Sequence, residues 1–334
     1  MHCDSNPLGE PMTTVTSIKA PLHTAVLFLV FNRPGTTAKV FEAIREAQPP
    51  RLYIAADGPR EGRVDEVEHV SRVRAIATEV DWPCDVKTLF REKNLGCKYA
   101  VSGAISWFFE QEQQGIILED DCLPHPDFFP FCETLLNRFR DDERVSVITG
   151  NNFQNGRRHG EASYYFSKYN HCWGWASWRR AWRHYRGDLQ FWPEYNTSDD
   201  WRRHIPDKVE RRYWEKIFDS THAGETNSWA YPWIASVWYC GGLTATPNVN
   251  LVSNIGFGPN STHTKSAGSP LAEVATSAIG DLSHPRVIIH NQVADDYVFD
   301  NVFDGRTQRF PRLLFNLPRR TLSLVCRTLK RFFA

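Results

Sequence analysis

Residues 115–125 read Gly-Ile-Ile-Leu-Glu-Asp-Asp-Cys-Leu-Pro-His, GIILEDDCLPH, and the prediction of the fold starts from this stretch. A short apolar run, typical of a buried strand, leads directly into three carboxylates, Glu119, Asp120 and Asp121. Pro124 ends the strand, because proline cannot donate a hydrogen bond to a neighbouring strand. The acids are therefore expected at the end of a buried strand, and the alternative is a solvated turn.

The sequence on both sides of this stretch alternates between β-rich apolar runs and amphipathic runs. The predicted strands cover residues 25–31, 51–57, 85–91, 115–120 and 145–150. The predicted helices cover residues 36–47, 64–79, 99–110 and 127–139. This alternation predicts an α/β fold with a mostly parallel central sheet and helices on both faces.

Ligands of such sheets bind at the carboxyl ends of the strands, and polar residues follow four of the predicted strands there. Asn32 and Arg33 follow the first strand, Asp57 the second, Arg91 the third and residues 119–121 the fourth. We expect these groups to converge on one rim of the sheet. Two local interpretations stay open, because Asn-Arg-Pro also suits a helix start and Asp-Gly-Pro an ordinary turn.

Adjacent carboxylates repel one another, so the cluster at 119–121 needs a positive partner. Mg²⁺ and Mn²⁺ are hard cations that bind through oxygen, typically one or two carboxylates together with phosphate oxygens and water. The sequence therefore predicts a divalent cation, Mn²⁺ or Mg²⁺, shared with a diphosphate.

With these residues identified, the chain resembles the nucleotide-diphosphosugar transferases of the GT-A fold over about residues 23–262. In that family a DXD-type motif ends a central strand and holds a metal ion on the donor diphosphate. Glu119-Asp120-Asp121 is similar to the EDD variant found in N-acetylglucosaminyltransferase I. The likeness is greatest to bacterial sugar transferases of surface-polysaccharide synthesis.

The resemblance implies a role for each residue of the rim. Asp121 would be the direct metal ligand, and Glu119 and Asp120 would contact the ribose and the transferred sugar. Arg33 would meet the nucleotide, and Asp57 would hydrogen-bond a uracil-type base.

The donor site would include three further residues. Asn32 and Arg91 lie at strand ends, and Lys98 lies in NLGCKYAVSGAISWFF, residues 94–109, which matches the family's helix along the donor pocket. His263 is the candidate for a late histidine that some GT-A enzymes add to the metal, although a loop histidine can simply be solvated.

The second half of the chain is rich in tryptophan, with ten of the twelve tryptophans between residues 173 and 238. HCWGWASW, residues 171–178, resembles the aromatic, glycine-containing segment on the acceptor side of such enzymes. Tryptophan has a large apolar face, so most of these residues are predicted to be core. Trp173 and Trp175 are the predicted contacts to the acceptor.

An inverting transferase needs a general base, usually a carboxylate, to take the proton from the acceptor hydroxyl. NTSDDWRRH, residues 196–204, resembles the DDW stretch that carries this base in N-acetylglucosaminyltransferase I and nominates Asp199 or Asp200. Residues 227–252 resemble the segment where related enzymes place an acidic pair, but no acid stands there and Glu225 is the nearest. The base and the stereochemistry therefore stay open.

The chain is expected to divide into a flexible leader (1–22), one two-lobed domain (23–305) and a basic tail (306–334). Within the domain, residues 23–150 are the predicted nucleotide-sugar-binding half and 151–305 the acceptor and catalytic half. After Asp304 the tail has eight Lys and Arg and no acid. Its amphipathic pattern over residues 313–334 predicts contact with an anionic membrane or docking on the protein's own core.

Composition excludes some partners. Lys plus Arg and Asp plus Glu are equal at 39 each, so no net field favours nucleic acid. The eight cysteines form no CxxC pair, and the N-terminal region lacks the apolar segment of a secretion signal. We therefore expect a cytoplasmic protein, at the inner face of the cytoplasmic membrane if the tail binds lipid.

The sequence predicts a metal-dependent glycosyltransferase that moves a sugar from a nucleotide-diphosphate sugar to a glycan or lipid-linked acceptor. One alternative is a sugar-1-phosphate nucleotidyltransferase, although NRPGTT after the first strand is not the glycine-rich loop of such enzymes. The other alternative is a non-catalytic carbohydrate-binding protein on a transferase scaffold.

Overall fold

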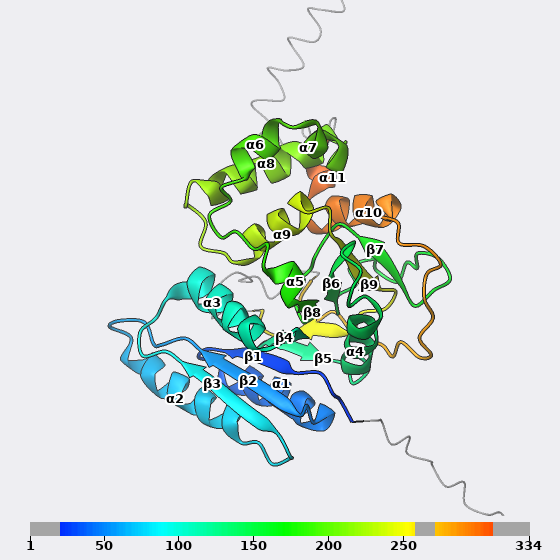
Figure 1. Ribbon diagram of the computed structural model, residues 1–334. Helices are drawn as coiled ribbons and strands as arrows, with labels where there is room; N and C mark the ends of the chain where they lie inside the picture. The colour runs from blue at the N-terminus through cyan, green and yellow to red at the C-terminus, as the bar shows by residue number, and fades with distance from the viewer. Residues whose placement is uncertain (1–20, 258–270, 310–334) are drawn as a thin grey trace, which may run out of the picture.

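The computed structural model describes residues 21–257 and 271–309, and its centre is one eight-stranded sheet (Figure 1). The strand order is β3-β2-β1-β4-β8-β6-β9-β7. Strands β8 and β7 run antiparallel to their neighbours, and the other pairings are parallel. The prediction of an α/β fold with a mostly parallel sheet is confirmed.

The first half of the chain builds one side of this sheet. The elements are, in order, β1 (Val26–Val30), α1 (Pro34–Ala47), β2 (Arg51–Ala56), α2 (Val64–Thr78), β3 (Asp85–Phe90), α3 (Gly96–Gln111), β4 (Gln114–Glu119), β5 (Cys122–Pro124), α4 (Phe128–Arg138) and β6 (Val145–Thr149). Each predicted strand and helix of this half is present, with small shifts at the ends.

The second half adds three strands to the same sheet and a lobe of helices above it. The elements are β7 (Tyr164–Ser167), β8 (Trp175–Trp178), α5 (Arg179–Trp182), α6 (Trp192–Thr197), α7 (Asp199–His204), α8 (Lys208–His222), α9 (Ala230–Tyr239), β9 (Leu243–Pro247), β10 (Val252–Asn254), α10 (Gln292–Val302) and α11 (Gly305–Gln308). Strand β10 pairs with β5 in a small second sheet.

Both faces of the large sheet are buried, because alternate strand residues enter two separate apolar clusters. In β1, Val26, Phe28 and Val30 pack with helices α1 and α4, whereas Leu27 and Leu29 pack with α3 and the helical lobe. Helices on both faces, as predicted, leave only the strand ends open to ligands.

The helical lobe is an aromatic core. Of the ten tryptophans between residues 173 and 238, nine are buried, and Trp173 is the partly buried exception. Burial of large rings explains why these short helices, which have weak helical tendency alone, are held in place.

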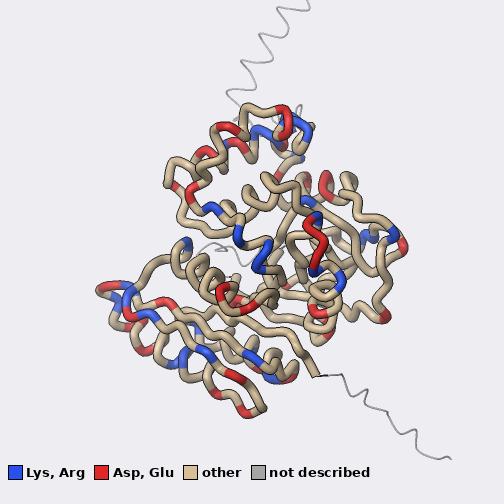
Figure 2. The backbone as a smooth tube through the Cα atoms, viewed as in Figure 1, with Lys and Arg blue, Asp and Glu red and all other residues tan. Residues whose placement is uncertain are grey.

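Charged residues of both signs are interspersed along the chain (Figure 2). None of the helices among the described residues is both long and apolar enough to span a bilayer. The predicted leader lies almost wholly outside the described residues, as does the predicted lipid-binding segment 313–334.

Candidate active site

The carboxyl ends of β1, β2, β3 and β4 meet at one rim of the sheet, because these strands are parallel neighbours. Val30 ends β1, and Leu29 pairs with Glu119 at the end of β4. The antiparallel strand β8 begins at the same rim, since Trp175 pairs with Ile117. The rim predicted from the sequence therefore exists, with the three acids at its centre.

Arg33 is the cation that contacts this acidic cluster. Its Nη2 lies 2.6 Å from Asp120 Oδ1, and its Nη1 lies 2.9 Å from Asp121 Oδ2. Asp120 also accepts a hydrogen bond of 3.0 Å from the backbone N–H of Phe31, which ties β4 to the end of β1. Arg33 and Asp120 are thus brought together as an ion pair within the rim.

Glu119 is different from its two neighbours. Within residues 21–257 and 271–309 its carboxylate has no hydrogen-bond or ion-pair partner. Burial, followed by repulsion from Asp121 and Asp120, raises the pKa of Glu119 to about 8. Asp120 and Asp121 share one guanidinium, so the three acids carry an excess of negative charge when all are ionised.

The pKa values of Asp120 and Arg33 reflect the same excess of negative charge. Burial is the main cause that raises the pKa of Asp120 to about 6, with Arg33 opposing it. Burial alone would lower the pKa of Arg33, but Asp120 and Asp121 outweigh it and raise that pKa. This site disfavours three full negative charges unless another cation is supplied.

Gly256 lies directly against the side chains of Asp121 and Arg33. A Cβ atom at position 256 would lie 2.2 Å from Asp121 Oδ2 and 2.6 Å from Arg33 Nη1, closer than real contacts allow. The neighbouring Ile255 N–H donates to the Asp121 carbonyl at 2.8 Å and fixes the approach of this segment. Glycine is therefore needed at position 256, because any side chain there would displace the Asp121 carboxylate or the Arg33 guanidinium.

The donor chemistry of this cluster fits a divalent cation that is completed by a ligand. Carboxylate oxygens with unsatisfied negative charge are the groups that Mg²⁺ and Mn²⁺ prefer. In the described part of the chain no three His, Cys, Asp or Glu side chains are arranged to hold a metal by themselves. A cation bound by these acids would therefore need further ligands besides the described side chains.

Asp57 lies on the rim, but its carboxylate is engaged with backbone. It accepts hydrogen bonds from the N–H groups of Gly58, Leu95 and Gly96 at 3.0–3.1 Å. These bonds hold the turn that starts α3 against the end of β2. The turn interpretation of Asp57 thus has a physical basis, and the predicted contact to a base stays a prediction.

Two other predicted donor contacts are also held by protein groups. Asn32 donates to Glu66 Oε1 at 2.8 Å, and Glu66 also binds Arg60. Arg91 donates to the carbonyl of Ala100 at 3.2 Å. These bonds organise the loops around the rim.

Lys98 lies in the first turn of α3. Its backbone N–H donates to Asn227 Oδ1 at 3.2 Å, and its ammonium group lies 5.7 Å from the centre of the Tyr99 ring. Asn227 belongs to the loop before α9, so the helical lobe touches the donor side of the rim at this point.

The two predicted acceptor tryptophans have different surroundings. Trp175 is only 1% exposed and lies among the rings of Trp182, Trp229 and Trp233, so it is a core residue and we do not keep it as an acceptor contact. Trp173 is partly buried, and its ring lies 5.7 Å from that of Phe257. Residues on the two sides of Gly174 therefore point to different environments.

The candidate bases Asp199 and Asp200 are not brought to the rim. They form the exposed first turn of α7, where they pair with Arg202 and Arg203, and α7 is well separated from β4 in Figure 1. Ser198 caps this helix by accepting a hydrogen bond from Trp201 N–H. The acidic pair therefore has a structural reason, since acids stabilise a helix N-terminus.

Glu225 is exposed and accepts a hydrogen bond of 3.0 Å from Ser220. It is two residues from Asn227, so its loop approaches the rim. His263 lies outside the described residues.

Sequence reasoning missed several residues at the rim. Gly256, Phe257 and Phe153 come from loops with no motif, and Glu66 comes from the first turn of α2. His171 was quoted in HCWGWASW but not singled out. Its spacing of two from Trp173 is the signal that could have found it, because alternate residues of an extended segment share a face.

Comparisons with known proteins give no family. No protein-family model matches the chain, and no curated protein matches it in sequence.

Three solved structures overlap part of the fold. A mannosyltransferase from Pyrobaculum calidifontis, in complex with GDP-Man and Mn²⁺, is 11% identical over 66% of this chain and 70% of its own, with a TM-score of 0.36. A CMP:2-keto-3-deoxy-manno-octonic acid synthetase with CTP is 14% identical over 67% of this chain and 88% of its own (TM-score 0.34). A UDP-glucose pyrophosphorylase with UDP-glucose is 11% identical over 44% of this chain and 62% of its own, with a TM-score of 0.25.

The chain thus spans less than two thirds of the length of the pyrophosphorylase. At TM-scores below 0.5 these overlaps do not assign an activity, so the function has to be inferred from this chain's own residues.

Proposed function

We propose that the protein is a metal-dependent glycosyltransferase that uses a nucleotide-diphosphate sugar as donor. The observation that carries this proposal is the cluster of Glu119, Asp120 and Asp121 at the carboxyl rim of the sheet. Among the described residues, Arg33 is the cation that pairs with Asp120 and Asp121, Glu119 has no partner, and Gly256 brings the backbone directly against Asp121.

Asp120 and Asp121 are buried and Glu119 is partly exposed beside them, so the charge that Arg33 does not compensate is costly to hold at this place. The excess negative charge at 119–121 therefore supports a cationic ligand. Asp121 would hold Mn²⁺ or Mg²⁺, and the unpaired Glu119 would contact the metal-bound donor. The metal would supply charge neutralisation for the departing nucleoside diphosphate.

The remaining donor contacts come from the loops of the rim. Arg33 would stay close to the diphosphate while it bridges the two aspartates, and Asn32, Arg91 and Lys98 would line the nucleotide. Asp57 would act through the turn at 95–96, whose backbone it holds, beside the nucleoside. His263 would be a second metal ligand.

The test is nucleotide binding by thermal shift, followed by release of nucleoside diphosphate from a panel of UDP- and GDP-sugars. We expect Mn²⁺ together with a nucleoside diphosphate to raise the Tm. Asp121→Ala should abolish that shift and lower kcat/KM by at least about 100-fold, because metal stabilisation is worth several kcal/mol.

Asp81→Asn is the matched control. Its carboxylate is exposed and pairs with Arg45 just before β3 begins, at the amino ends of the parallel strands and so away from the carboxyl rim, and it should leave both readouts unchanged. A protein that no nucleoside diphosphate stabilises in the presence of metal would contradict the proposal.

Two results would indicate a different function. Pyrophosphate release from a nucleoside triphosphate and a sugar phosphate would indicate a nucleotidyltransferase. Sugar binding with no turnover of any nucleotide sugar would indicate a carbohydrate-binding protein.

The acceptor would be a glycan or lipid-linked glycan in bacterial surface-polysaccharide or lipopolysaccharide synthesis. The basic segment 313–334 would hold the enzyme at the inner face of the cytoplasmic membrane. Deletion of this segment should reduce binding to anionic liposomes.

A further inference from the structure

The proposed transfer lacks a residue that takes the proton from the acceptor hydroxyl. We propose that His171 is this general base and that it lies in an aromatic acceptor wall formed with Phe153, Trp173 and Phe257. This inference rests on the proposed function and adds a catalytic residue to it.

The backbone places His171 at the same rim as the acids. Its carbonyl accepts a hydrogen bond of 2.9 Å from Thr149 Oγ1, at the end of β6. Thr149 pairs with Trp175 of β8, and Trp175 in turn faces β4 near its carboxyl end. His171 therefore lies two strands away from Glu119, across the open edge of the sheet.

The residue after His171 feels the charge of the acids. Glu119 and Asp121 both contribute to raising the pKa of Cys172, after burial as the main cause, so its thiol is within electrostatic reach of the carboxylates. Gly174 continues this path, since a Cβ there would meet Leu118 and Val252. Segment 171–174 thus crosses the rim beside the donor site.

His171 and Trp173 share a wall of edge-to-face rings. The Phe153 ring centre lies 4.6 Å from that of His171 and 5.3 Å from that of Trp173, at 89° in both cases. Trp173 meets Phe257 at 5.7 Å, and Phe257 follows the glycine that lies against Asp121. The wall therefore runs from the acidic cluster to the imidazole, and all four rings are only partly buried.

The imidazole is available for proton transfer. Within residues 21–257 and 271–309 neither ring nitrogen has a hydrogen-bond partner. Burial lowers the pKa of His171 to about 4, so the ring is neutral at pH 7. A base with this pKa has about the strength of an ordinary Asp or Glu, the usual base of such reactions. Unlike them, it adds no negative charge next to the donor diphosphate.

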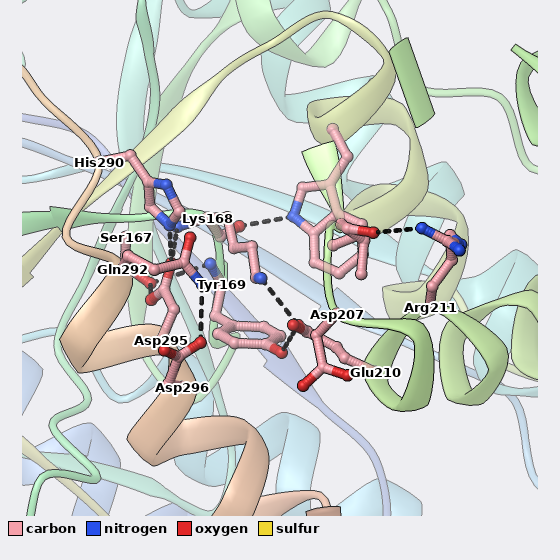
Figure 3. A network of polar contacts seen from close by, with 12 residues as sticks. Ser167, Lys168, Tyr169, Asp207, Glu210, Arg211, His290, Gln292, Asp295 and Asp296 are labelled. Carbon is pink, nitrogen blue, oxygen red and sulfur yellow. Dashed lines mark hydrogen bonds and ion pairs between the residues drawn. The ribbon is translucent and has the colours of Figure 1, made fainter. Parts of the chain in front are cut away.

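The negative charge of Asp295 stabilises the protonated form of the His171 imidazole. Asp295 opposes the lowering of the His171 pKa. This carboxylate is fully buried in the network of Figure 3, where it accepts hydrogen bonds from Ser167 Oγ at 2.5 Å and Lys168 N–H at 2.9 Å, and contacts His290. Its position is fixed from three sides.

The step is a single in-line displacement. The acceptor oxygen forms a bond to the anomeric carbon, and the bond from that carbon to the diphosphate oxygen breaks with its electron pair. The hydroxyl proton passes to His171 and then to water. The anomeric configuration is therefore inverted.

The experiment uses the full chain, Mn²⁺ and the nucleotide sugars that give turnover. We expect His171→Gln to lower kcat for nucleoside diphosphate release by about 100-fold or more, the usual range for loss of a general base. The thermal shift by Mn²⁺ and nucleoside diphosphate should stay at the wild-type value. Imidazole should partly restore the rate of His171→Ala.

His159→Gln is the matched control. This histidine also has a pKa lowered by burial, but its Nε2 lies 2.9 Å from Gln154 Oε1, so it already has a partner. Its kcat should stay at the wild-type value, and added imidazole should not change it.

The outcomes separate the two proposals. If the wild type turns over and His171→Gln retains more than about a tenth of its kcat, less than about 1.4 kcal/mol is lost and the assignment fails alone. A product with retained anomeric configuration also overturns the assignment of His171. The assignment fails as well if imidazole does not restore the rate of His171→Ala whereas the glutamine in His171→Gln does. If no nucleoside diphosphate binds with metal and no donor turns over, both proposals fail.

Discussion

The protein contains two clusters of carboxylates that face opposite electrostatic conditions. In the second lobe, Glu210 lies 2.8 Å from Lys168 Nζ with both side chains 1% exposed, and Asp295 is met by Ser167, the Lys168 N–H and His290 (Figure 3). At the rim, Asp120 and Asp121 share Arg33, and Glu119 stands next to them. In the second lobe, protein groups compensate the charges of the carboxylates, whereas at the rim the described residues compensate them only in part.

The difference separates a structural role from a ligand-binding role. The network of Figure 3 joins the end of β7 to α8 and α10, which are far apart in the sequence, and every acid in it has a donor or cation. The rim cluster joins two adjacent strands and leaves Glu119 without a partner in the described part of the chain. An acid whose pKa is raised because no partner compensates its charge is typical of a functional site.

The largest expected effect is in the balanced cluster. Glu210→Ala leaves the ammonium group of Lys168 buried without its counter-charge, which should cost about 3–5 kcal/mol of unfolding free energy. Urea unfolding followed by tryptophan fluorescence measures this loss, since the lobe is rich in tryptophan.

The double variant Lys168→Met with Glu210→Leu is the control for that experiment. It removes both charges and replaces them with apolar groups, so it should recover most of the stability. A single variant as stable as the wild type would show that the two clusters do not differ in the way described.

The next effect is at the rim. Gly256→Ala puts a methyl group where Asp121 and Arg33 already leave no room, so the carboxylate has to move. We expect Mn²⁺-dependent nucleotide affinity to fall about tenfold, which is 1.4 kcal/mol. Isothermal titration with Mn²⁺ and the nucleoside diphosphate measures it.

Gly35→Ala is the control, because a Cβ at position 35 meets nothing within 4 Å. It should leave the affinity unchanged. Wild-type affinity in Gly256→Ala would mean that the position of the Asp121 carboxylate does not matter for the ligand.

Local patterns were sufficient for the first half of the fold. The strands β1, β2 and β4 are apolar runs ended by polar residues, and α1 begins at Pro34 after the rim residue Arg33. Helix α3 begins at Gly96, three residues before the predicted start, because the carboxylate of Asp57 accepts the N–H groups of Leu95 and Gly96. A cap from 38 residues away is not visible in a local pattern.

The candidate site was harder to predict, because charge balance depends on contacts between distant segments. The Asp199-Asp200 pair matched a motif, yet Ser198 shows that the two acids start a helix. Trp175 and Trp173 were equivalent in the sequence, but only Trp175 begins a strand whose face is covered by α9. Phe153 and Gly256 reach the rim through loops that no periodicity describes.

The smallest effect concerns Glu119 itself and depends on pH. The pKa of this acid is raised from 4.5 to about 8 in the folded protein, so the folded state holds its proton more tightly than the unfolded state. The stability from this acid is complete below pH 4.5 and is lost as the pH rises through 8. Asp120, raised from 3.8 to about 6, acts in the same direction at lower pH.

Glu119→Gln replaces the acid with a neutral group of the same shape, so the benefit should grow as the pH rises from 4.5, where the unfolded wild type begins to ionise, to about 8. In metal-free buffer we expect nearly equal Tm values at pH 4 and a variant more stable by at least about 2–4 °C at pH 8.5, which corresponds to about 1 kcal/mol or more. Scanning calorimetry at the two pH values, with EDTA present, measures both. A variant no more stable than the wild type at pH 8.5 would mean that Glu119 has a partner after all. The contrast with the balanced cluster of Glu210 and Asp295 would then disappear, and with it the main reason to expect a cation at the rim.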